Sequence, residues 1–143
     1  MARMIVDDFH KTELEQLEPQ VVRGIIKKCL WAGAKVVEKE MKNTIESRHH
    51  VVHGYMRDSV SQTEVFEDID RSYVDIYPQG TDPRGVSNEM KNKIIINGYY
   101  DVFTGKSKRK KDPYIKTMAK NITPRVLAVM EYQFNLCIEE LKK

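Results

Sequence analysis

The residues best suited to chemistry are three histidines, His49, His50 and His53, which fall close together in the sequence. Imidazole is a common zinc ligand, so a trio of this kind could belong to a metal site. A structural zinc site needs four ligands and usually includes cysteines, and neither a cysteine nor a pair of carboxylates lies near these histidines. We therefore predict solvent-facing loop histidines and no bound metal, with metal binding by the trio as the alternative.

Other patterns that could support catalysis are incomplete. Serines and threonines are plentiful, but none lies in the glycine-flanked turn of a nucleophile elbow. The stretch 105–107 (GKS) lacks the preceding glycine of a phosphate-binding loop. Glu64, Glu67, Asp68 and Asp70 lack the glycine and the bidentate glutamate of an EF-hand, so we expect them to keep a hairpin turn soluble. The sequence therefore predicts neither an enzyme nor a cofactor.

The most distinctive feature is a basic segment at 106–111, made up of Lys106, Lys108, Arg109, Lys110 and Lys111. The formal net charge of +3 becomes −2 without these five cations, so the positive charge is local. Such a segment could contact phosphates, or it could be a solvated loop that keeps a neighbouring strand from pairing with other chains. Both interpretations stay open. Tyr99 and Tyr114 are near enough to stack on bases, but core positions are favoured for both.

Composition indicates one small globular domain. The chain has 143 residues, of which 41% are hydrophobic and 31% charged, and a length of about 100–150 residues is typical of a single domain. Cys29 and Cys137 belong to no paired motif and fall at apolar positions of helical spacing, which favours a reduced, cytoplasmic protein. We expect no signal peptide and no membrane span, because a span needs about 20 consecutive apolar residues.

The apolar residues predict a long N-terminal helix over 19–47, with Pro19 in its first turn, where a proline N–H is not needed. Residues 1–18 are expected to form an arm or a short helix, and residues 19–143 one α+β domain. Gly24 and Gly33 lie inside the long helix, where glycine is unfavourable. Either another element packs closely there or the two glycines are simply tolerated.

Shorter patterns predict an antiparallel sheet of three to four strands. Runs at 59–66 and 72–77 flank a polar turn and indicate a hairpin, and 99–104 (YYDVFT) indicates a third strand. Ser87 is a candidate helix N-cap for a short inserted helix, and 93–97 is left open between helix and strand.

Two prolines mark the helical C-terminal part of the chain. The pair Asp112-Pro113 indicates a helix start, and Pro124 is expected to begin the final helix, which packs on the sheet.

The stretch 53–60 (HGYMRDSV) resembles the signature that opens the hairpin in small head–tail connector and tail-completion proteins of long-tailed phages, often labelled tail components. Gly54, Arg57, Ser59 and Val60 agree with that signature, and Met56 replaces its leucine. His53 stands where the family has threonine, and the usual upstream proline is absent. Further on, an aromatic strand ends near Gly105, a basic loop follows, and Pro113 and Tyr114 match the proline–aromatic pair that starts the C-terminal helix.

The resemblance implies a structural subunit of a phage or prophage head–tail junction. Such proteins form homo-oligomeric rings, contact other junction or tail-tube proteins, and pass from the host cytoplasm into the virion. In such a ring the basic segment is a candidate contact for DNA in the lumen or for a neighbouring subunit. The alternative from a different class is a small nucleic-acid-binding or regulatory domain that uses the basic segment as its contact.

Overall fold

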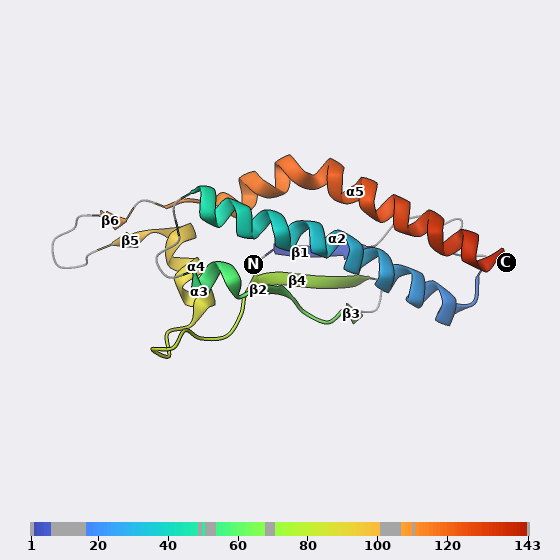
Figure 1. The fold of residues 1–143 in the computed structure, drawn as a ribbon, viewed down its shortest axis with the longest axis horizontal. Coiled ribbons are helices and arrows are strands. Elements are labelled where there is room, and N and C mark those ends of the chain that lie inside the picture. Colours follow the sequence, from blue (N-terminus) through green and yellow to red (C-terminus); the bar gives the residue numbers. More distant parts are fainter. Residues whose placement is uncertain are drawn as a thin grey trace.

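The computed structural model describes residues 2–6, 17–48, 50, 54–67, 71–100, 107–109 and 111–142. Their order confirms the predicted α+β class (Figure 1). The elements are β1 (Ala2–Val6), α2 (Pro19–Ser47), α3 (Tyr55–Asp58), β2 (Val60–Gln62), β3 (Phe66–Glu67), β4 (Ser72–Pro78), α4 (Asn88–Asn97), β5 (Tyr99–Tyr100), β6 (Ser107–Arg109) and α5 (Tyr114–Leu141).

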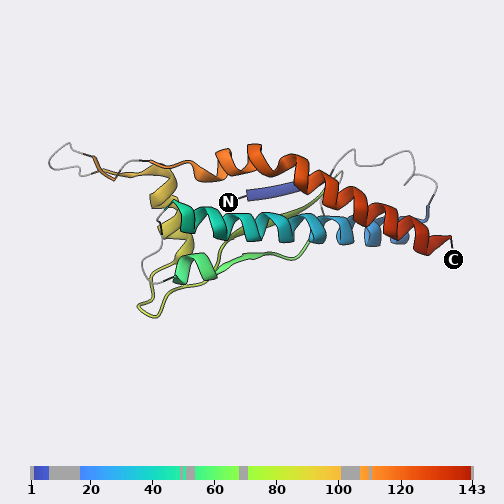
Figure 2. The same cartoon turned by 45° about the horizontal axis from the view of Figure 1, so that its top comes forward.

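Two long helices dominate the molecule. Helix α2 has the predicted bounds, Pro19–Ser47, with the proline at its first position. Helix α5 runs beside it over most of its length (Figures 1 and 2). The buried stripe of α2 consists of Ile25, Cys29, Leu30, Gly33, Ala34, Val37, Met41 and Ile45. The facing stripe of α5 consists of Tyr114, Met118, Ile122, Val126, Met130, Phe134 and Cys137.

The prediction that Pro124 begins a separate final helix is wrong, because α5 is continuous and Pro124 lies inside it. A proline in a helix interior removes one backbone hydrogen bond and normally breaks the helix. Here the buried residues Met118, Ile122, Val126 and Met130 follow one another at four-residue intervals across the proline. Packing of this uninterrupted stripe on α2 compensates for the lost bond.

The two glycines of α2 differ. At Gly33 an added Cβ would lie 2.5 Å from Met4 Cε and 3.0 Å from Met130 Cγ, so β1 and α5 approach the helix closely there. At Gly24 nothing lies within 4 Å of the same position. Gly33 therefore permits close packing of three elements, and Gly24 is simply tolerated.

The main sheet is antiparallel, with strand order β1-β4-β2 and with β3 also paired to β4. The predicted hairpin is confirmed, since Val60 pairs with Pro78 and Phe66 with Tyr73. The register shifts by one residue between β2 and β3, where the Asp75 N–H donates to Thr63 Oγ1 at 3.1 Å. The side chain of Thr63 therefore takes the place of a backbone partner at this irregularity.

The N-terminus differs from the predicted arm or short helix. Residues Ala2–Val6 form strand β1, which pairs with β4 along its whole length. Arg3 lies opposite Asp75 and donates to both carboxylate oxygens, at 2.7 and 3.0 Å. Its guanidinium also lies 4.3 Å from the centre of the Tyr73 ring. A five-residue strand is specified mainly by these partners, which are far away in the sequence.

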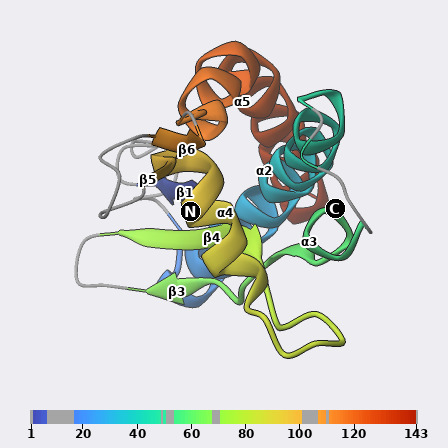
Figure 3. The ribbon, with the colours of Figure 1, turned by 90° about the vertical axis from the view of Figure 1, so that its left-hand side faces the viewer.

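The helices cover one face of the sheet. An end-on view shows α2 and α5 together on one side of β4 (Figure 3). Val60, Val74 and Ile76 join the buried residues of both helices in one core. Helix α2 packs on β4, β2 and β1, and Met4 of β1 and Met118 of α5 line the same groove. None of the helices in the described ranges is long and apolar enough to cross a membrane.

Helix α4 answers two questions from the sequence, whether Ser87 is a helix N-cap and whether 93–97 is helix or strand. Ser87 is the predicted N-cap, since Met90 N–H donates to its Oγ at 3.2 Å, and residues 93–97 are helical.

The predicted third strand does not join the main sheet. Its described part, β5, pairs instead with β6 in a separate two-stranded sheet, and residues 101–104 lie outside the described part. We call this pair the β5–β6 ribbon; it projects beyond the ends of α2 and α5 (Figure 1).

Candidate functional site

Two residues of the basic segment lie on the β5–β6 ribbon. Lys108 and Arg109 belong to β6, and Lys111 is exposed just after it, whereas Lys106 and Lys110 lie outside the described residues. Both ends of the ribbon are fixed to α4, because Gly98 N–H donates to Ile94 O at 2.8 Å and Asp112 N–H donates to Ile95 O at 2.9 Å. The backbone that carries Lys108 and Arg109 is therefore separate from the main sheet and is anchored to α4 on both sides.

A polar cluster joins the base of the ribbon to the end of α2. His50 Nε2 lies 2.8 Å from Asp112 Oδ2, and Arg48 Nη1 donates to Asp112 Oδ1 at 3.3 Å. The His50 side chain is only 11% exposed, so the expectation of a solvent-facing histidine is wrong at this position. His49 and His53 lie outside the described residues. Within the described ranges no group of three histidine, cysteine, aspartate or glutamate side chains could hold a metal ion.

Tyr114 lies in the core next to this cluster, with its ring beside that of His50. Pro113 precedes the first helical residue, and Tyr114 is fully buried and donates its hydroxyl hydrogen to Asn92 Oδ1. Burial raises the pKa of the Tyr114 phenol well above its usual range, and the carboxylates of Glu89 and Asp112 add to that rise. The ring is therefore not accessible for stacking on bases, and the core position favoured by the sequence is confirmed.

Next to Tyr114, helix α4 buries polar atoms without partners. Both carboxylate oxygens of Glu89 and the Nδ2 of Asn92 are enclosed and have no hydrogen-bond partner among the described residues. The two residues are three positions apart and so share one face of α4. From the sequence, Glu89 looks like an ordinary acidic residue in the first turn of a helix. The enclosure of its two carboxylate oxygens was missed because it involves residues that are distant in the sequence, such as Tyr114.

Replacing Glu89 with glutamine is expected to raise the free energy of unfolding by about 1 kcal/mol or more. Burying an unpaired carboxylate costs several kcal/mol, and the amide removes that charge, although about 0.3–1 kcal/mol of favourable helix-dipole interaction is lost. Urea unfolding at neutral pH measures the change. The exposed-side-chain control Glu46→Gln should be close to neutral, and a Glu89→Gln protein less stable than the wild type would show that the carboxylate has a partner in solution.

The signature-like turn forms α3, a helical turn that the sequence did not predict. Gly54 precedes it with a φ of +80°, in the left-handed region that favours glycine. Met56 is buried, and Ser59 Oγ donates to Met56 O at 2.8 Å. Arg57 Nε donates to Asp58 Oδ1 at 3.0 Å, and its Nη1 lies 3.5 Å from a Glu46 carboxylate oxygen. The buried Met56 and the Ser59 hydrogen bond fix the connection between α2 and β2, whereas the ion pairs of Arg57 are exposed on their acidic side and add little. The turn therefore has a structural role in the fold.

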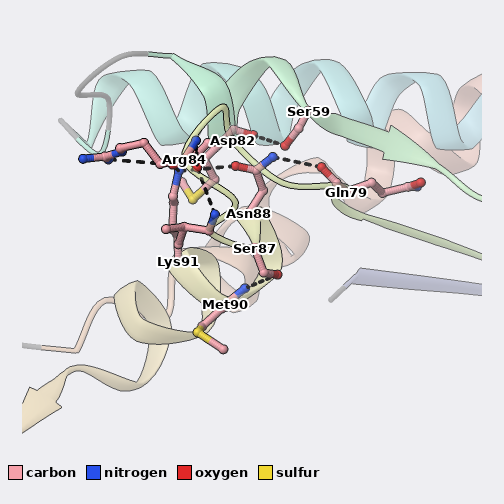
Figure 4. A network of polar contacts seen from close by, with 10 residues as sticks. Ser59, Gln79, Asp82, Arg84, Ser87, Asn88, Met90 and Lys91 are labelled. Atoms are coloured by element: carbon pink, nitrogen blue, oxygen red, sulfur yellow. Dashed lines mark hydrogen bonds and ion pairs between the residues drawn. The ribbon is translucent and has the colours of Figure 1, made fainter.

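The loop between β4 and α4 is organised around a second buried acid, Asp82 (Figure 4). The Asp82 side chain is fully enclosed. Its Oδ1 accepts from the backbone N–H groups of Arg84 and Val86, both at 2.9 Å, and its Oδ2 accepts from Lys91 Nζ at 2.7 Å. These hydrogen bonds, with that from Lys91 the largest contribution, lower the pKa of Asp82 to about 2. The loop is therefore a rigid projection near α3 and α4.

Asp82 is expected to make the stability of the protein sensitive to acid. Its pKa of about 2 in the folded chain is below the value of about 3.9 for an unfolded aspartate. Its contribution is therefore present above about pH 4 and is lost as the pH falls towards 2. Thermal unfolding at pH 5 and pH 2.5 should show a larger decrease for the wild type than for Asp82→Asn, while Asp58→Asn, at an exposed acid, should behave like the wild type. Equal decreases in wild type and Asp82→Asn would contradict this prediction.

Cys29 is not an activated thiol. Burial, with a smaller effect from Cys137, raises the pKa of the Cys29 thiol to about 12, so it is not a nucleophile at neutral pH.

Several large apolar side chains are exposed. Trp31, Phe66, Leu127 and Tyr132 are 42–67% exposed. Val126, and not Leu127, belongs to the buried stripe of α5. This arrangement is suited to contact with other molecules.

Comparison with protein-family models, with curated proteins and with solved structures found no significant match for the chain.

Proposed function

We propose that the chain is a structural subunit of a phage or prophage head–tail junction, a tail-completion or connector protein that assembles into a homo-oligomeric ring. In this proposal its partners are further copies of itself and other junction or tail-tube proteins. It acts first in the host cytoplasm and then in the virion. No catalytic step and no cofactor belong to the proposal.

The observation that carries the proposal is the β5–β6 ribbon. The ribbon forms a sheet of its own, separate from the main sheet, and projects beyond the helix pair from a base fixed to α4 (Figure 1). A small domain gains little stability from a ribbon outside its core, since a lone two-stranded hairpin is marginal in water. Contact with another subunit or with nucleic acid would stabilise such a ribbon, and such contact would explain why the chain has it. The exposed apolar side chains of both long helices add further contact surface.

The same ribbon supports a second candidate, a small nucleic-acid-binding or regulatory domain. A two-stranded β-ribbon fits the major groove of DNA, and Lys108 and Arg109 lie on β6. In a junction ring these cations would face DNA in the lumen or a neighbouring subunit. The two candidates differ in whether the protein assembles without nucleic acid.

Neutralising the basic segment separates these roles. We expect a protein in which Lys106, Lys108, Arg109, Lys110 and Lys111 are all glutamine to keep its circular dichroism spectrum and its unfolding midpoint. Light scattering and negative-stain images of the wild type, alone and with the tail-tube and portal proteins of the same phage, should show rings. A matched control neutralises five exposed lysines elsewhere, Lys39, Lys93, Lys116, Lys120 and Lys142.

The two candidates predict different results for the neutralised protein. A contact between subunits predicts that ring formation fails, and a lumenal DNA contact predicts intact rings with weaker DNA retention. A nucleic-acid-binding domain predicts no rings and a gel shift that weakens steeply with salt. Loss of folding in the neutralised protein would contradict all of them, because the segment would then be part of the structural framework.

A further inference from the structure

A groove on the outer side of the helix pair surrounds the only tryptophan of the chain with lysines. The groove has a volume of about 650 Å³ and extends from α2 to Gln133 of α5. Trp31 is 42% exposed within it. We call it the lysine–tryptophan groove; its lining residues on α2 are Gly24, Lys27, Lys28, Trp31, Ala32 and Lys35.

The spacing of these residues brings the charges around the indole ring. Lys27, Lys28 and Lys35 are four, three and four positions from Trp31, so all three lie on the same side of α2. The ion pair of Lys28 with Glu140 is 3.9 Å long and exposed on both sides, so it neutralises the groove only weakly. Gly24 leaves the floor open, since nothing lies within 4 Å of an added Cβ. The groove therefore suits an acidic segment that carries one bulky apolar side chain.

The chain presents such a segment on its own sheet layer. Strand β3 is short, and Phe66 on it is 43% exposed, with its ring 5.4 Å from that of Tyr73. Glu64 and Glu67 lie on either side of Phe66 in the chain and are also exposed. Glu67 lies 3.7 Å from Arg23, a pair exposed on both sides and therefore weak. We call Glu64, Phe66 and Glu67 the acidic edge.

We propose that the lysine–tryptophan groove of one copy receives the acidic edge of a second copy, with Phe66 against Trp31 and the two glutamates among the lysines. This inference rests on the proposed ring assembly. In the proposed ring the contact is head-to-tail, so it continues from copy to copy until the series closes. The exposed acids and exposed ring of the acidic edge complement the groove, and this complementarity is the ground for choosing a second copy over nucleic acid, whose phosphates and bases would also fit lysines and an indole.

Disulfide trapping tests whether the two surfaces meet. Single variants Lys35→Cys and Glu64→Cys leave Trp31 and Phe66 in place, and the native Cys29 and Cys137 are buried. Mixing the two under mild oxidation should give the mixed dimer at least about tenfold faster than mixing Glu64→Cys with the matched control Lys116→Cys, an exposed lysine of α5. Equal rates in the two mixtures would overturn the proposal.

Charge reversal gives an independent test. Lys27→Glu/Lys35→Glu makes groove and edge both acidic, and Glu64→Lys/Glu67→Lys makes both basic. Each variant alone should self-associate about tenfold or more weakly than the wild type in sedimentation experiments, because like charges then meet at the contact. An equimolar mixture of the two should recover wild-type association, since every contact again joins opposite charges. No recovery in the mixture would count against the contact.

Other results separate this inference from the proposed function. Rings without the specific disulfide would leave the junction role standing and show that a different surface closes the ring. The specific disulfide without rings would support the contact but would contradict the closed ring. Control-level disulfide formation together with loss of DNA retention in Lys27→Glu/Lys35→Glu would make the groove a nucleic-acid site and the proposal wrong.

Discussion

Replacing Tyr114 with alanine is expected to lower the free energy of unfolding by about 3–5 kcal/mol, the range for removing a large aromatic ring from a core. Tyr114 is fully buried where α5 begins, and it bonds to Asn92 of α4 while the adjacent Asp112 holds Arg48 and His50. Its loss would leave a cavity and would also release the base of the β5–β6 ribbon. Urea unfolding followed by circular dichroism measures the change.

Tyr114→Phe separates packing from hydrogen bonding. It keeps the ring but leaves the Asn92 carbonyl oxygen unpaired beside an amide nitrogen that already lacks a partner. We expect a loss of about 1–3 kcal/mol, as for other buried groups left unsatisfied. If Tyr114→Phe were as stable as the wild type, the hydroxyl would contribute nothing, and the link from α5 to α4 would depend on packing alone.

The neighbouring residues Leu30 and Trp31 are expected to differ greatly in the stability lost on substitution by alanine. Leu30 is fully buried in the core, and Leu30→Ala should lower the free energy of unfolding by about 2–5 kcal/mol. Trp31→Ala should change it by less than about 1 kcal/mol, because the indole is 42% exposed and alanine has the higher helix propensity. Paired thermal and urea unfolding curves give both values.

This comparison also bears on function, since a large apolar side chain that the fold does not need is available for contact. Trp31→Ala should weaken self-association while leaving the fold intact. Tyr132→Ala, at an aromatic residue of α5 that is 67% exposed, is the matched control. A Trp31→Ala protein as destabilised as Leu30→Ala would show that the indole belongs to the core, and the lysine–tryptophan groove would then lose its anchor.

The sequence predicted the elements whose signals are local. The bounds of α2 follow from its apolar stripe and from Pro19, and the start of α4 follows from Ser87, because a helix and its cap are specified by residues within one or two turns. The hairpin of β2 and β3 with β4 was predicted for the same reason, since its strands lie close together in the chain.

The errors occur where distant residues decide. Strand β1 depends on Asp75 and the rest of β4, more than sixty residues away. The helix continues through Pro124 because its partner α2 is long enough to bind the whole stripe. The burial of Glu89 and the enclosure of Asp82 depend on how α4 and its loop meet the body. For the candidate site, the basic segment was predicted from its charges, but its position on a separate ribbon was not.

The side-by-side packing of α2 and α5 has a mechanical consequence. Helices of 29 and 28 residues are each about 42 Å long at 1.5 Å per residue. Tension applied along this direction, between the ribbon at the start of α5 and the start of α2 at the opposite end, would load the interface in shear. All of its contacts would have to slide together, whereas a perpendicular pull would peel them apart one turn at a time. A subunit built in this way should withstand axial stress far better than lateral stress, which single-molecule pulling along the two directions can compare.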